Sequence, residues 1–210
     1  MSACISGGDV WASNSLINVG NKEYSADTII VADENLASDN SAVVGIANDV
    51  SNSKSGITMK NGTKLTVNSV ASSGRAYAVA VNNGAGFGFV GKGEFTATGS
   101  DQAQARTIRN NGGGAISFDG DITVNTNAGK LFSVAVEAWD SSDQIAVVEF
   151  KGGRTIINAT GDKVQVNAIQ VVSNNDTGSL IDFCADKTVI TNTSTVAGGS
   201  NWANIARNLV

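Results

Sequence analysis

A short apolar segment recurs along this chain at intervals of about 30 residues. Five copies carry a large apolar residue at the same position, and these residues lie 30, 29, 32 and 33 positions apart. One such unit cannot bury its apolar face alone, so a repeat of this length indicates stacked units that share a core. The five residues are Met59, Phe89, Phe118, Phe150 and Phe183, and residues 16–22 resemble a sixth copy.

Two further segments with alternating apolar and polar residues follow each copy. In one unit they are residues 121–127 and 132–138. Alternation with period two is typical of β-strands, and stacking the units about 4.8 Å apart pairs each strand in parallel with its equivalent in the next unit. The sequence therefore predicts an all-β fold, a right-handed parallel β-helix (β-solenoid) of about six three-stranded coils of roughly 30 residues. We expect the five recurring apolar residues to form one inward column.

The composition is compatible with tight corners between short strands. The chain contains 24 glycines and no proline. Glycine reaches the positive φ angles that tight corners need, whereas proline would remove a donor from strands that pair on both edges. A β-sandwich also combines short strands with glycine-rich turns and stays open as an alternative. Residues 86–91 match GxGxxG, but we expect a strand after them, which indicates a glycine-rich strand and corner rather than a nucleotide site.

We expect a single solenoid domain over residues 1–210. Residues 1–15 are a candidate N-terminal cap, because a bare end coil would leave a sheet edge unpaired. Residues 194–210 are expected to be the last strand or a C-terminal cap. The first residues lack a basic region followed by a long apolar one, so they do not read as a signal peptide. No apolar run approaches the roughly 18 residues of a membrane span, so we expect no membrane insertion by this segment.

Charge and residue types exclude several classes of function. The net charge is −5, and lysines and arginines occur singly, which argues against a nucleic-acid partner. The chain has no histidine, which excludes Ser-His-Asp triads and histidine zinc sites. Cys4 and Cys184 are 180 positions apart and form neither a metal pair nor a disulfide framework. We therefore expect no metal and no cofactor.

Several repeat units resemble the passenger region of bacterial autotransporters of the pectin-lyase-like β-helix type. The resemblance covers roughly residues 16–193. It implies export as part of a longer precursor, a place at the bacterial cell surface or in the medium, and adhesion to a host or neighbouring-cell surface protein or glycan. It names no catalytic residue, and no export signal or C-terminal membrane domain is recognisable, so we expect a passenger fragment without enzyme activity. The segments that carry it are GITMKNGTKLTVNS (56–69), GAISFDGDITVNTNAG (114–129) and VVEFKGGRTIINATG (147–161).

Trp139, Asp140 and Asp143 form the most distinctive candidate binding loop. An exposed tryptophan beside polar groups can stack on a sugar ring or anchor a protein partner. The alternative is structural, with Trp139 packed against the side of the solenoid.

Three carboxylates suggest an alternative function as a polysaccharide lyase or hydrolase. Glu149 and Asp182 precede two residues of the apolar column, so they are expected to be outward neighbours on adjacent coils, and Asp119 lies on the same face in the coil before. Carboxylates on such a sheet can act as a pair in hydrolysis or bind Ca²⁺. The alternative is solvated surface charge, with Lys151 offsetting the carboxylates.

Outward threonines and asparagines on the second strand of each unit suggest ice binding as a second alternative. Threonine also suits any exposed strand because of its β-propensity, and we expect the array to break at residues 155–158. The residues are Thr66, Asn68, Thr96, Thr98, Thr123, Asn125, Thr191 and Thr193.

Arg106 and Arg109 on the third strand are expected to pair with Glu137 of a neighbouring coil. As surface ion pairs they would stabilise the fold by roughly 0–1 kcal/mol.

Overall fold

The computed structural model describes residues 16–17, 20–34, 42–112, 114–140, 145–162, 165–172, 178–194 and 203–209. These residues form 17 strands and no helix, and the strand pairs are all parallel. Each residue pairs with one that lies 28 to 37 positions further along the chain, one turn later. The parallel β-helix expected from the repeat is confirmed.

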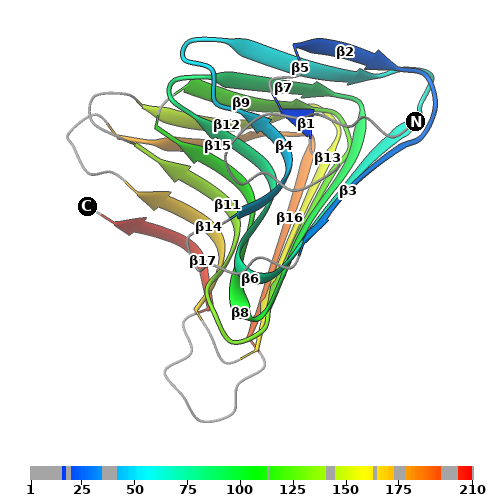
Figure 1. Cartoon of the computed structure of the whole chain (residues 1–210). Helices are drawn as coiled ribbons and strands as arrows, with labels where there is room; N and C mark the ends of the chain where they lie inside the picture. The colour runs from blue at the N-terminus through cyan, green and yellow to red at the C-terminus, as the bar shows by residue number, and fades with distance from the viewer. Residues whose placement is uncertain are drawn as a thin grey trace.

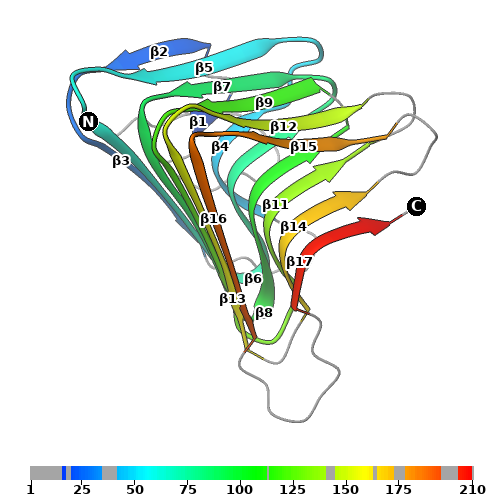
Figure 2. The same cartoon turned by 180° about the vertical axis from the view of Figure 1, so that it is seen from behind.

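The strands form three faces of a wedge-shaped rod (Figure 1, Figure 2). The second and third faces converge away from the first face and meet at a narrow apex. The first face contains β2 (Asn21–Tyr24), β5 (Lys54–Met59), β7 (Gly86–Val90), β9 (Gly114–Asp119), β12 (Ala146–Lys151) and β15 (Leu180–Cys184). The second contains β3 (Thr28–Glu34), the first parts of β6 (Lys64–Asn82) and β8 (Lys92–Asn111), β10 (Ile122–Ala128), β13 (Arg154–Gly161) and β16 (Lys187–Ser194). The third contains β1 (Leu16–Ile17), β4 (Ala42–Asn48), the second parts of β6 and β8, β11 (Ser133–Trp139), β14 (Val166–Val172) and β17 (Ala203–Leu209).

We expected a cap at residues 1–15, and a last strand or a cap at residues 194–210. Within 194–210, residues 203–209 form β17, which pairs with β14. The candidate cap at 1–15 lies outside the described residues. In the described part of the chain, no helix is both long and apolar enough to cross a membrane.

Stacked aromatic rings form the centre of the core. The ring centroids of Phe118 and Phe150 are 5.2 Å apart, those of Phe150 and Phe183 are 5.3 Å apart, and in both pairs the stacked rings are nearly parallel. Phe89 pairs in register with Phe118, and Ile57 pairs with Phe89 one turn earlier. The expected inward column is therefore confirmed from Phe89 to Phe183, but its residue in the preceding turn is Ile57.

Met59 was expected in this column, and that prediction is wrong. Ile57 and Leu65 are eight positions apart across the corner after β5, whereas their partners Phe89 and Gly93 are only four apart. The spacing between turns is therefore 32 residues before the corner (Ile57 to Phe89) and 28 after it (Leu65 to Gly93). A uniform spacing of about 30 selects Met59, which is two positions beyond the true column residue. Met59 is still buried, at the end of β5.

The apex between the second and third faces is packed with small side chains because the two sheets approach closely there. A Cβ added at Gly99 would lie 2.5 Å from the Ala103 carbonyl oxygen. Both strands that run through the apex without a break, β6 and β8, depend on this small-residue packing. The buried cluster at the apex is Ala32, Val43, Ala71, Ala76, Ala97, Ala103, Ala105 and Ala128.

Strands of the third face bend at one position, where the ladder skips a pair of residues, as between β4 and β6 and between β11 and β14. In β11 two successive residues, Ala135 and Val136, both belong to the core, and the ladder to β14 skips Ala135. The outward residues on either side, Val134 and Glu137, are consequently three positions apart. This bend places outward residues of neighbouring strands in two columns on the third face.

Candidate functional site

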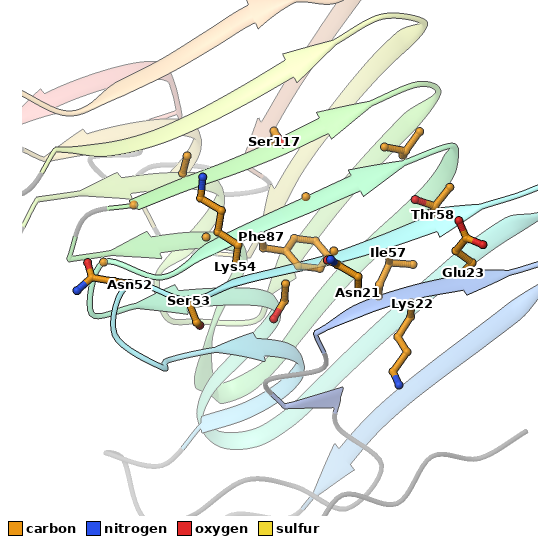
Figure 3. A pocket seen from close by; sticks show the side chains of 18 residues that line it. Asn21, Lys22, Glu23, Asn52, Ser53, Lys54, Ile57, Thr58, Phe87 and Ser117 are labelled. Atoms are coloured by element: carbon orange, nitrogen blue, oxygen red, sulfur yellow. The ribbon is translucent and has the colours of Figure 1, made fainter.

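The first face carries a groove of about 550 Å³ that spans β2, β5, β7 and β9 (Figure 3). Its floor is formed by Gly56, Gly86 and Gly88, which have no side chain to fill it. Gly56 pairs with Gly88 on the neighbouring strand, so the open floor continues from one turn to the next. A Cβ added at Gly88 would meet only the Ser117 hydroxyl oxygen, at 3.6 Å.

The sequence of β7 explains why the groove forms there. Glycine alternates with phenylalanine over residues 86–89, and Phe87 and Phe89 are both buried on the inward side. The Phe87 ring packs edge-on against Phe118, with 6.4 Å between the centroids. Over residues 86–89 all the side-chain bulk therefore lies beneath the sheet, and only Val90 at the end of the strand points outward. The GxGxxG match at 86–91 is followed by β8, a strand, as expected, and the groove over it was not anticipated from the sequence.

Polar side chains border the groove and supply several kinds of hydrogen-bonding group. Lys54 lies on one side of the Phe87 ring, and Glu23 and Thr58 lie on the other (Figure 3). Ser117 borders the groove from β9. An ammonium, a carboxylate and two hydroxyls thus face a floor of glycine backbone.

The charges of the groove are unevenly balanced. The Glu23 carboxylate lies 2.6 Å from the Lys60 ammonium, and Glu23 is the only carboxylate among the described residues that line the groove. Lys54 forms no ion pair with any residue that the structure describes. The groove is therefore lined by one neutralised acid and by two lysines, Lys22 and Lys54, that form no ion pair among the described residues.

The three carboxylates proposed for catalysis lie on the first face. Asp119 is on β9, paired with the groove-lining Val90. Glu149 and Asp182 are on β12 and β15, further along the rod than the groove. Glu149 and Asp182 are direct neighbours in register, as expected. Asp119 is two positions further along its strand, because the partner of Glu149 on β9 is Ser117 and Asp119 pairs with Lys151. Lys151 Nζ lies 2.6 Å from Glu149 Oε2, and this hydrogen bond and charge raise the Lys151 pKa above its usual value.

Asp182 has a different neighbour on its own strand. The Cys184 thiol donates to Asp182 Oδ2 at 3.5 Å, and this contact raises the pKa of the exposed thiol. Cys184 is free, and Cys4 lies outside the described residues. The described residues contain no cluster of three or more His, Cys, Asp or Glu side chains suited to a metal ion.

The candidate binding loop lies at the end of β11. Trp139 is half-buried, and the guanidinium carbon of Arg109 lies 5.7 Å from its ring centroid. Asp140 is buried, and its N–H donates to the Val172 carbonyl oxygen at 3.1 Å. Asp143 lies outside the described residues. Trp139 thus contacts Arg109 on the third face, and its role in binding stays a prediction.

Glu137 and two arginines form an ion-pair network on the third face. Arg106 Nη1 donates to both Glu137 carboxylate oxygens, at 2.9 and 3.0 Å, and Arg109 Nε lies 3.1 Å from Oε2. Arg109 also donates to the Tyr77 hydroxyl at 2.7 Å. The predicted pairing is confirmed, but its description as a surface pairing is wrong, because the Glu137 side chain is 0% exposed. Both carboxylate oxygens are occupied, which suits a structural clamp rather than a ligand site.

The outward positions of the second face continue in register through the segment where we expected a break. Thr123 pairs with Ile156, and Asn125 pairs with Asn158, whose amide donates to Asn125 Oδ1 at 2.9 Å. The threonine array is instead interrupted by residue type, since Glu94 and Ile156 share the column of Thr123. A regular threonine lattice is therefore absent from this column.

No known family model, curated protein or solved structure matches this chain. Its function is consequently inferred from the geometry of its own surfaces. Among these, the groove on the first face offers open space beside polar side chains.

Proposed function

We propose that this chain is a non-catalytic binding segment of a passenger-type β-helix, and that it binds a glycan in the groove on its first face. The observation that carries the proposal is the open glycine floor of Gly56, Gly86 and Gly88 beneath a polar border. Rigid sheets hold such groups in place, so binding does not require ordering of the site.

The backbone of the floor favours a glycan over a peptide. An extended peptide gains affinity by adding a strand to a free sheet edge. The floor strands β5 and β7 are paired on both sides, β5 with β2 and β7, and β7 with β5 and β9. A ligand in the groove must bond to side chains, and the hydroxyls of a sugar are suited to the amide, hydroxyl and ammonium groups there.

The acid in the groove favours binding over catalysis. Glycoside hydrolysis in most families uses two carboxyl groups on either side of the scissile bond. Glu23 is a single carboxylate, paired with Lys60. The pair Glu149 and Asp182 is the basis of the alternative enzyme function, but Lys151 contacts Glu149 and the Cys184 thiol contacts Asp182.

The proposal includes a place at the bacterial cell surface or in the medium, as part of a longer exported protein. Its support is the resemblance of residues 56–69, 114–129 and 147–161 to autotransporter passengers, together with the β-helix fold. A stiff rod would present the groove to glycans or proteins of a host or a neighbouring cell.

The test is retention of the folded chain on a panel of immobilised polysaccharides, with released sugar measured in the same wells, with and without Ca²⁺. We expect retention of at least one glycan and no released product. Product release that disappears in Glu149→Gln or Asp182→Asn would overturn the proposal in favour of the enzyme. Absence of retention on every glycan would also overturn it.

A further inference from the structure

Two lysines line the groove, and only one is directed toward it. Figure 3 shows the Lys22 side chain pointing away from the other polar groups, whereas Lys54 extends from β5 beside the glycine floor. The stem of Lys54 lies against Gly86, with its Cγ 3.4 Å from the position of an added Cβ. Lys54 is therefore supported along its stem while its ammonium remains exposed.

The ammonium of Lys54 has no counter-charge in the described part of the chain. Glu23 is engaged by Lys60 at 2.6 Å, and the five other ion pairs of the described residues involve residues outside the groove. A protein with a net charge of −5 thus presents one uncompensated positive charge inside its groove. Anions near such a group gain a charge-assisted hydrogen bond, which is about twice as strong as a neutral one.

We propose that the groove selects glycans with carboxylated sugars, and that Lys54 binds the sugar carboxylate. This inference rests on the proposed glycan-binding function and specifies its ligand class. The amide of Asn21 and the hydroxyls of Thr58 and Ser117 bind sugar hydroxyls beside it. No proton or bond is transferred in this interaction.

The charge balance favours sparsely charged carboxylated polymers over densely sulfated ones. The one ammonium directed into the groove, that of Lys54, pairs with one anion at a time. The net negative charge of the whole chain also repels a polymer with several charges per sugar. No arginine lines the groove to provide the bidentate contacts that sulfate or phosphate clusters favour.

The experiment measures the affinity of the folded chain for hyaluronan and polysialic acid, each beside its carboxyl-reduced form, with dextran sulfate as the sulfated comparison. We expect the carboxylated polymers to bind about tenfold more tightly than their reduced forms, and the difference to shrink as salt is raised. Lys54→Ala should remove the difference and Lys54→Arg should retain it. Lys92→Ala is the matched control, because it deletes an exposed lysine outside the groove and should leave affinity unchanged.

Each result has a distinct meaning. Equal binding of native and reduced polymers, or loss of selectivity in Lys92→Ala as large as in Lys54→Ala, overturns the role of Lys54 but leaves glycan binding intact. Tightest binding to dextran sulfate overturns the carboxylate preference. Absence of binding to every polymer overturns both this inference and the proposed function.

Discussion

Glu137 on β11 forms ion pairs with two arginines of the neighbouring strand β8. Its side chain is fully buried between Arg106 and Arg109. The pairing of these residues follows from strand periodicity alone. Their burial does not, because it depends on how the third face is covered and on the bend at Ala135.

Removal of Glu137 is therefore expected to cost far more than removal of an exposed acid. Glu137→Ala leaves two arginines without their shared partner, and breaking a buried ion pair costs about 3–5 kcal/mol. Glu149→Ala is the control, since its pairing with Lys151 is exposed and contributes roughly 0–1 kcal/mol. Urea denaturation followed by circular dichroism measures both. Equal midpoints for the two variants would contradict the clamp.

Cys184 provides a residue-level test of where the carboxylates lie. Because the thiol donates to Asp182, its protonated form is stabilised and its pKa lies above the usual value. In a Cys4→Ser variant, the rate of Cys184 alkylation by iodoacetamide should rise at a higher pH than the rate for a thiol without such a contact. Asp182→Asn should shift the alkylation profile to lower pH. An unchanged profile would place Asp182 away from the thiol.

Glycines in the strands of the first face have two different roles: some allow a close backbone approach, and others leave open space above the sheet. Gly114 begins β9 with φ +87°, and a Cβ there would lie 1.9 Å from the Ala85 carbonyl oxygen. Gly88 lies within β7 with free space above it. Composition alone predicts tight corners, and it gives no indication of which glycines open a groove.

Alanine substitutions should separate these two roles. An alanine in place of Gly114 would have to adopt a positive φ, and its Cβ would clash with the backbone. We therefore expect Gly114→Ala to lower the free energy of unfolding by more than about 1–2 kcal/mol. Gly88→Ala should be neutral or stabilising, because glycine weakens a strand interior. Thermal melting of both variants decides this. A melting temperature for Gly114→Ala at or above that of Gly88→Ala would be inconsistent with the geometry of the corner.

At the scale of the whole molecule, the repeat predicts the parallel β-helix because every turn must bury its apolar face against the next. The column from Phe89 to Phe183 follows from spacing. Register at Met59 does not, because the corner after β5 has four more residues than the corner after β7. The groove was also not predicted, since it depends on glycines of neighbouring turns that come into register only when the coils stack.

If the groove on the first face is the ligand site, a side chain that fills it should weaken binding. Gly88→Val places a branched side chain over the floor at a position where a Cβ fits, and valine favours strands. Thr123→Val is the matched control, an outward change on the second face outside the groove. Affinity for the glycan retained by the native chain should fall at least about tenfold in Gly88→Val, with the fold unchanged, and stay constant in Thr123→Val. Full affinity in a folded Gly88→Val variant would show that the glycan binds elsewhere.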